Sequence, residues 1–99
     1  MVFEPLEIRV LEKTGCSLEL EVKGEGHTLL NMLVDFLNRR PDVEYASYVI
    51  EHPLVGTPRL LIRTKNRDPV EVLDEALDEI EKLLNTFYLE VEKTLHAKR

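Results

Sequence analysis

Apolar and polar residues alternate over two short segments near the start of the chain, residues 6–11 and 18–23. A period of two is typical of a β-strand with one buried face. Gly15 lies between the two segments and supplies the backbone freedom that a turn requires. We therefore expect an antiparallel hairpin whose apolar residues share one face of a sheet.

The period changes after Gly24-Glu25-Gly26, where apolar residues begin to recur at helical spacing. Thr28 is suited to cap the start of this helix, and Pro41 disfavours a helical residue before it, so the helix should end near Arg40. The apolar positions are Leu29, Leu30, Met32, Leu33, Val34, Phe36 and Leu37. They extend beyond one stripe, which favours a helix that is covered on more than one side.

Residues 43–50 and 59–64 predict a second pair of strands, because both segments are rich in β-branched and other apolar residues. The segment that joins them contains two Pro and one Gly and reads as a connection. In the second strand, Leu60 and Ile62 lie on one face and Leu61 lies on the other. The polar residues 65–67 then form a turn.

The last helix has a clear start signal. Asp68 can cap it, Pro69 fits its first position, and Glu71 stands where a capping box requires an acid. One apolar stripe then recurs at alternating spacings of three and four residues. This apolar seam comprises Val70, Leu73, Leu77, Ile80, Leu84, Phe87 and Val91. No Gly or Pro follows Pro69, so the helix should continue to Lys98 and measure roughly 45 Å.

The order strand, strand, helix, strand, strand, long helix predicts an α+β fold. We expect a four-stranded antiparallel sheet with both helices on one face, and a single domain over residues 1–99. A strand of ordinary length reaches roughly 20 Å, so the last helix should extend past the sheet. Phe87, Tyr88, Val91 and Leu95 should then lie outside the core and mark an interaction site. The alternative is that the whole apolar seam packs on the chain's own sheet.

The charge of the chain disfavours some classes of function. The formal net charge is -6, and residues 68–99 carry nine acids against four bases. An acidic chain is poorly suited to bind nucleic acid by itself or to lie as a basic helix on a membrane. Seven acids fall between Asp68 and Glu81 with no base among them, which usually indicates a solvated face and less often a docking surface. The basic residues Arg59, Arg63, Lys65 and Arg67, with Arg39 and Arg40, should meet acids.

The sequence contains no recognisable catalytic or metal-binding motif. Cys16 is the single cysteine, so no internal disulfide can form and a reducing compartment is favoured. His27, His52 and His96 lack metal-ligand spacing and read as structural or solvated residues. No apolar run is long enough to span a membrane, and residues 1–5 lack the features of a signal peptide. We therefore expect a cytoplasmic protein without cofactor.

Several segments together resemble a known family. They are residues 24–33 (GEGHTLLNML), 43–48 (VEYASY), 52–54 (HPL), 62–64 (IRT) and the Asp68-Pro69 helix start. In this order and spacing they resemble the small α-like subunits of multisubunit RNA polymerases, the family of archaeal subunit L and of the eleventh subunit of RNA polymerase II. The likeness covers almost the whole chain. Leu30 departs from it, because many eukaryotic relatives have glycine at that position.

The resemblance implies a non-catalytic assembly subunit. Family members are similar to the dimerising domain of the bacterial α subunit and pair through their first and last helices with a larger α-like subunit, called D in archaeal RNA polymerase. The pair forms a platform for the large catalytic subunits, with the small zinc-binding subunits N and P nearby. Direct contact with nucleic acid or membrane is not implied, nor is any cofactor.

The resemblance carries candidate interface residues over by position. They are His27, Thr28, Leu30, Asn31, Leu33, Val34 and Leu37 in the first helix, and Leu77, Ile80, Leu84, Phe87, Tyr88 and Val91 in the last. Two other interpretations remain open. One is a self-contained homodimeric binding module with a small-molecule site between sheet and helix, and the other is a small enzyme that uses His27 and His52.

Overall fold

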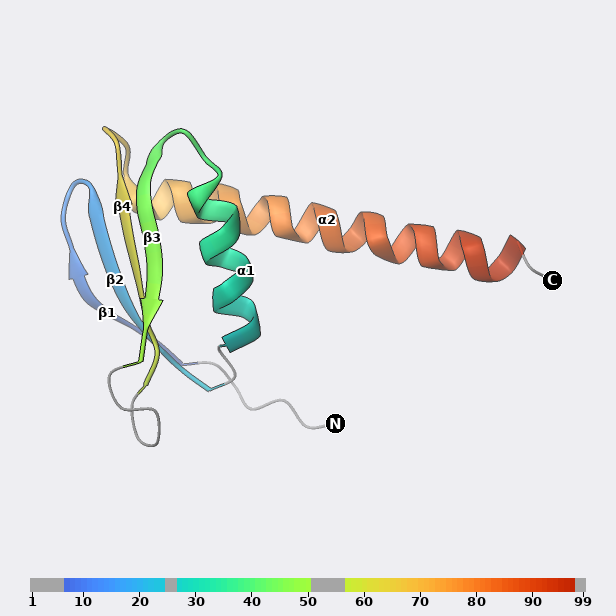
Figure 1. Ribbon diagram of the computed structural model, residues 1–99, viewed down its shortest axis with the longest axis horizontal. Coiled ribbons are helices and arrows are strands. Elements are labelled where there is room, and N and C mark those ends of the chain that lie inside the picture. The colour runs from blue at the N-terminus through green and yellow to red at the C-terminus, as the bar shows by residue number, and fades with distance from the viewer. Residues whose placement is uncertain (1–6, 25–26, 51–56, 98–99) are drawn as a thin grey trace.

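The computed structural model describes residues 7–24, 27–50 and 57–97. Its elements are β1 (Glu7–Lys13), β2 (Ser17–Lys23), α1 (His27–Asn38), β3 (Val43–Val49), β4 (Arg59–Thr64) and α2 (Pro69–Ala97). Figure 1 shows the four strands as one layer, with both helices on the same side of it and α2 projecting far beyond the sheet. The predicted α+β order and the long last helix are confirmed.

The strands form one antiparallel sheet in the order β1-β2-β4-β3. The two central strands are in register, with Leu20 opposite Leu60 and Leu18 opposite Ile62. Ala46 of β3 lies opposite Ile62 from the other side. These residues are buried and share the face that the helices cover, as their alternation with polar residues predicts.

The core lies between this face and the two helices. α1 contributes Leu30, Leu33 and Leu37, which are almost completely buried. These three positions repeat at i, i+3 and i+7, so a single stripe of α1 faces the sheet. The first turns of α2 contact β2 and β4, and α1 lies mainly against β3.

The expectation for β1 is right about pairing and wrong about burial. β1 and β2 form the predicted hairpin, but every residue of β1 is exposed. Ile8 pairs with buried Val22 and Val10 pairs with buried Leu20, so both lie on the helix side of the sheet. They are nevertheless 57% and 59% exposed, because β1 is an edge strand and the helices lie over the other three strands.

The two helix starts differ in how well their caps are predicted. α1 begins at His27, so Thr28 lies inside the first turn and is not the N-cap. At α2, Asp68 is the cap as predicted, and its Oδ1 accepts a hydrogen bond from the Val70 N–H at 2.9 Å. The capping box is wrong, because the Glu71 carboxylate lies 3.5 Å from the Arg67 guanidinium. A charged partner draws this carboxylate away from the backbone of the cap.

α2 is rotated relative to the orientation that the apolar seam predicts. Its buried residues are Pro69, Val72, Ala76 and Ile80. Val70 and Leu77 of the seam are 44% and 40% exposed, because the apolar arc of α2 is wider than the strip that the sheet covers. The predicted overhang is confirmed, since no described residue after Ile80 is buried. We refer to residues 69–80 as the root of α2 and to residues 81–97 as the overhang.

Candidate partner interface

The overhang of α2 carries a continuous exposed apolar surface. Phe87 is 67% exposed, and the residues that lie within three to four positions of it are exposed as well. The exposed large apolar residues of the overhang are Leu83, Leu84, Phe87, Tyr88, Leu89, Val91 and Leu95. Because an α-helix has 3.6 residues per turn, all of these residues except Leu89 lie on one side of α2. Exposed apolar surfaces of this kind are typical of interaction sites.

The predicted interface residues differ in how far the chain itself covers them. Thr28 and Asn31 of α1 are exposed, as are Leu77, Leu84, Phe87, Tyr88 and Val91 of α2. Val34 is half-buried, and the side chain of His27 lies outside the described residues. The buried residues are Leu30, Leu33, Leu37 and Ile80.

Four of the predicted interface residues belong to the core of the isolated chain. Leu30, Leu33 and Leu37 face the sheet because they form the single apolar stripe that α1 turns inward, and Ile80 is the last residue of α2 that the core covers. These side chains are covered by the chain's own sheet and helices. The accessible apolar surface therefore belongs mainly to α2, and α1 presents more polar residues such as Asn31 and Asp35.

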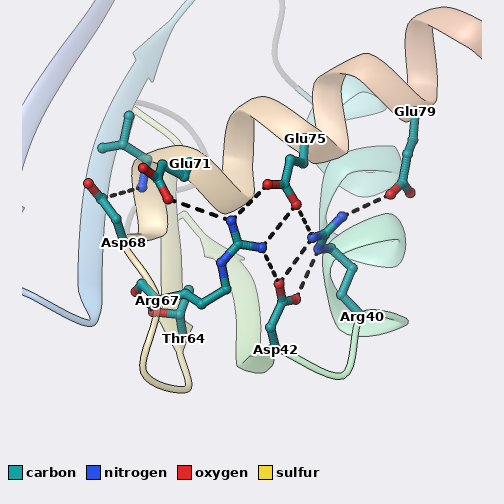
Figure 2. Close-up of polar contacts among 9 residues, drawn as sticks. Arg40, Asp42, Thr64, Arg67, Asp68, Glu71, Glu75 and Glu79 are labelled. Atoms are coloured by element: carbon teal, nitrogen blue, oxygen red, sulfur yellow. Dashed lines mark hydrogen bonds and ion pairs between the residues drawn. The ribbon is translucent and has the colours of Figure 1, made fainter.

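An ion-pair network lies beside the root of α2 (Figure 2). The sequence predicts that its arginines meet acids, but it does not say which acids. Two arginines come from the turns before β3 and before α2, and the acids come from the first of these turns and from α2. The network comprises Arg40, Asp42, Arg67, Glu71, Glu75 and Glu79. The sequence held one signal for it: acids at positions 71, 75 and 79 recur every four residues and therefore line one side of the helix.

Two carboxylates each contact both arginines. Arg40 binds Asp42 through Nε and Nη2, each at 3.0 Å, and Arg67 binds Glu75 through Nη1 at 3.0 Å and Nη2 at 2.7 Å. Arg40 also donates to Glu75, and Arg67 donates to Asp42 at 2.8 Å. The result is a closed ring of alternating charge, extended by Arg40 Nη1 to Glu79 at 2.8 Å. Paired, two-point contacts of this kind are the stronger and more directional form of the ion pair.

The network shifts the titration of its members. Hydrogen bonds from Arg67, and then from Arg40, lower the pKa of Glu75 to about 2. The pKa of Asp42 is lowered, chiefly by its hydrogen bond from Arg40. The hydrogen bonds of Arg40 to Asp42 and of Arg67 to Glu75 raise the pKa of each arginine. All four groups therefore remain charged at neutral pH.

The expected pairing with acids is confirmed for all five arginines named, since Arg39 pairs with Asp35 at 2.8 Å and Arg40 belongs to the network. Arg59 contacts Glu19 at 2.7 Å, Arg63 contacts Glu44 at 3.4 Å, and Arg67 belongs to the network. The acidic side of α2 is accordingly not only a solvated face. Glu71, Glu75 and Glu79 bind Arg40 or Arg67 of the same chain, so part of the acidic run is paired within the protein.

The described residues do not support the two alternative interpretations. The space between α1 and the sheet is filled by apolar side chains such as Leu30, Leu37 and Leu60, where the small-molecule site was expected. A surface cavity of about 490 Å³ lies at the end of α1, lined in part by Phe36, Arg39 and Pro41. His52 lies outside the described residues, so the geometry of the proposed histidine pair is not described. His96 lies 3.0 Å from Glu92 on the overhang.

Metal-ligating clusters and membrane-spanning helices are two further features that the described residues lack. No group of three or more His, Cys, Asp or Glu side chains could hold a metal ion among residues 7–24, 27–50 and 57–97. Within the same ranges, none of the helices combines the length and the apolar character needed to cross a membrane. Cys16 is a free, half-buried thiol.

Comparison with known proteins gives consistent matches. A family model described as the RNA polymerase Rpb3/Rpb11 dimerisation domain matches residues 17–89. The chain is 37% identical over 91 residues to DNA-directed RNA polymerase subunit Rpo11 of Methanococcoides burtonii, covering 88% of this chain and 100% of that protein. It is 36% identical over 97 residues to Rpo11 of Methanocaldococcus jannaschii, covering 89% and 98%.

A solved structure agrees with these sequence matches. The fold is similar to the crystal structure of DNA-directed RNA polymerase subunit L from Thermoplasma acidophilum, with a TM-score of 0.83 and 27% sequence identity. The match covers 91% of this chain and 89% of that chain. The likeness therefore includes the arrangement of the sheet and helices and is not limited to short motifs.

Proposed function

Because the chain belongs to the family of RNA polymerase Rpb3/Rpb11 dimerisation domains, we propose that it forms a heterodimer with the larger α-like subunit, called D in archaeal RNA polymerase. The chain is a non-catalytic assembly subunit of DNA-directed RNA polymerase, like its relatives named Rpo11. Residues 1–99 act as one dimerisation domain. The pair would serve as the platform on which the large catalytic subunits assemble, with subunits N and P nearby.

The observation that carries this proposal is the exposed apolar surface of the overhang. Leu84, Phe87, Tyr88 and Val91 have no apolar cover within the described residues, and leaving them in water is unfavourable. A homologous partner that contributes its own apolar helix would bury them. Burial of a large apolar side chain contributes about 1.5–3 kcal/mol, so a few such residues can support a stable pair.

The role of the remaining surface follows from its charge. A net charge of -6 disfavours direct binding to DNA or RNA, so nucleic-acid contacts would belong to other subunits of the enzyme. We place the chain in the cytoplasm, where its archaeal relatives would transcribe. No cofactor is required for an assembly role.

The test is a pull-down and titration of the full chain with the purified larger α-like subunit. The double variant Leu84→Asp/Phe87→Asp introduces two charges into the apolar surface without touching the core, because both residues are exposed in the isolated chain. We expect binding to be lost, since each Asp removes apolar burial and adds an unpaired buried charge.

A matched control carries the same two new charges on the opposite side of the helix. Asn85→Asp/Leu89→Asp changes exposed residues that lie away from the seam, and binding should be retained. If the Leu84/Phe87 variant still co-purifies with the larger α-like subunit at wild-type yield, the proposed interface is wrong. If the wild-type chain fails to bind that subunit, the proposed heterodimer is wrong.

A further inference from the structure

In the proposed heterodimer the overhang meets its partner far from the sheet. The direction in which α2 leaves the sheet therefore decides where the apolar surface lies. Residues after Ile80 project roughly 25 Å at about 1.5 Å per residue. A tilt of about 10° at the root would move the far end of such a helix by roughly 4 Å. That displacement is comparable to the width of a side chain and would misalign an apolar surface that packs closely.

The root packs through apolar contacts against the sheet and against α1. Its buried residues are Pro69, Val72, Ala76 and Ile80, three of which have small side chains. Hydrophobic attraction is non-directional, so it favours burial of these residues without selecting one helix angle by itself. Directional contacts, such as ion pairs, would favour one particular angle between α2 and the sheet.

The ion-pair network supplies directional contacts on a different side of the root. Glu71, Glu75 and Glu79 stand one turn apart, so the network binds α2 along three successive turns. Those turns coincide with the root and end where the overhang begins. The guanidinium of Arg67 meets the Glu75 carboxylate through two parallel contacts, which fixes orientation as well as distance.

The arginines themselves are held by the end of the sheet. The Lys65 N–H donates a hydrogen bond to the Asp42 carbonyl at 2.9 Å and thereby joins the turn before β3 to the turn before α2. The hydroxyl of Thr64, a residue that is almost completely buried, donates to the Arg67 carbonyl. The Arg40 side chain is only 14% exposed. The network therefore links α2 to two turns that are hydrogen-bonded to each other at the end of the sheet.

We propose that Arg40 and Arg67 are positioning residues for partner binding: they set the angle at which α2 leaves the sheet and so hold the overhang in the orientation that the partner requires. The inference rests on the proposed heterodimer. The arginines act through α2 and need no contact with the partner themselves.

The experiment measures the direction of α2 and the affinity for the partner in the same chains. Spin labels at Lys23→Cys and Lys93→Cys, in a Cys16→Ser background, report the distance between the sheet and the overhang by double electron–electron resonance. Both labelled positions are exposed and lie outside the network. The test variant is Arg40→Gln/Arg67→Gln. The matched control, Arg39→Gln/Arg63→Gln, removes two arginines that pair elsewhere on the chain.

We expect the distance distribution to broaden in the test variant and to remain narrow in the control. Affinity for the purified larger α-like subunit should fall roughly tenfold in the test variant, because only the fraction of molecules with a correctly aimed helix can bind. The conservative variant Arg40→Lys/Arg67→Lys keeps the charge and should recover part of both losses. If the test variant does not fold, Glu79→Gln removes one exposed contact of Arg40 and should broaden the distribution to a smaller extent.

Each alternative result has a defined meaning. An unchanged distance distribution overturns the inference, even if affinity falls, because the arginines would then act by another route. A broadened distribution with unchanged affinity for the larger α-like subunit overturns it as well. Failure of the wild-type chain to bind that subunit, with the same broadening in the test variant, would instead refute the proposed heterodimer.

Discussion

Asn38, the last residue of α1, links this helix to an edge of the sheet. Its Nδ2 donates a hydrogen bond to the Ala46 carbonyl and its Oδ1 accepts one from the Ala46 N–H, both at 2.9 Å. β3 is an edge strand, so these backbone groups face away from β4 and have no neighbouring strand in the sheet. The amide of Asn38 matches one donor and one acceptor in the way that a further strand would.

We expect Asn38→Ala to lower the free energy of unfolding by about 1–2 kcal/mol, because it removes two partly buried hydrogen bonds. Urea denaturation of the full chain measures the difference. Asn31→Ala changes an exposed amide of the same helix and should stay within about 0.5 kcal/mol of wild type. Equal effects of the two substitutions would show that the contact with Ala46 contributes no specific stability.

Glu75 makes stability depend on pH in acid. Its pKa is about 2 in the folded chain, against an ordinary value of 4.5, because Arg67 and Arg40 favour the ionised form. A lowered pKa contributes stability that is complete above about pH 4.5 and is lost as the pH falls toward 2. Asp42, which faces the same two arginines, contributes with the same sign.

The free energy of unfolding should therefore fall more steeply between pH 4.5 and 2 in the wild type than in Glu75→Gln. The two curves should converge near pH 2, where the carboxyl becomes neutral as well. Urea titrations at several pH values measure both slopes. Parallel curves over this range would mean that Glu75 gains nothing from its arginines.

At the scale of the element, α2 uses different sides of one apolar arc along its length. The root turns Val72 and Ala76 inward, and Val70 and Leu77 remain on the exposed side. Beyond Ile80 the whole arc is exposed. One helix thus contributes to the chain's own core and carries the exposed apolar surface on which the proposed heterodimer depends.

The rotation of α2 can be tested with two identical substitutions in its first turn. Val72 is fully buried, so Val72→Ala should cost about 2 kcal/mol through lost burial and a residual cavity. Val70 is 44% exposed, so Val70→Ala should change stability by less than about 0.5 kcal/mol. Thermal or urea unfolding distinguishes the two. A larger loss of stability in Val70→Ala than in Val72→Ala would mean that α2 has the orientation that the apolar seam predicts.

At the scale of the whole molecule, the overhang dominates the shape. The Cα radius of gyration is 16.0 Å and the longest extent is 53 Å, whereas a compact chain of this length has a radius of about 13 Å. Small-angle scattering of the Leu84→Asp/Phe87→Asp variant, which should be monomeric, is expected to give a radius close to the larger value. A radius near 13 Å would mean that α2 folds back on the sheet when it is alone.

Much of the fold could be predicted from local patterns. The bounds of β4, the pairing of β1 with β2, the Asp68 cap and the exposure of the overhang all match the sequence-based expectations. The prediction failed for the burial of β1 and for the N-cap of α1. Hydrophobic period and capping preference depend on residues within one segment. They do not show which neighbouring element will cover that segment.

The candidate site shows the same division. Phe87 and Tyr88 could be found from the length of the apolar seam, because a helix of that length must extend past a sheet of four short strands. Leu30, Leu33 and Leu37 could not be separated from the interface, because helical spacing is the same for a residue that faces a sheet and one that faces a partner. Arg40 and Glu75 are 35 positions apart, so the spacing of the acids on α2 shows that they share one side of the helix but does not identify Arg40 as their partner.

The sequence by itself determined the order of the elements, the apolar face of the sheet, the length of α2 and the family of the chain. Those features depend on periodicity, capping and ordered motifs, which are local in the sequence. Only the tertiary structure decided the rotation of α2, the exposure of β1 and the ion-pair network at the root. These depend on how separate elements meet: the apolar arc of α2 is wider than its contact with the sheet, and the charges that orient it come from turns that are distant in the chain.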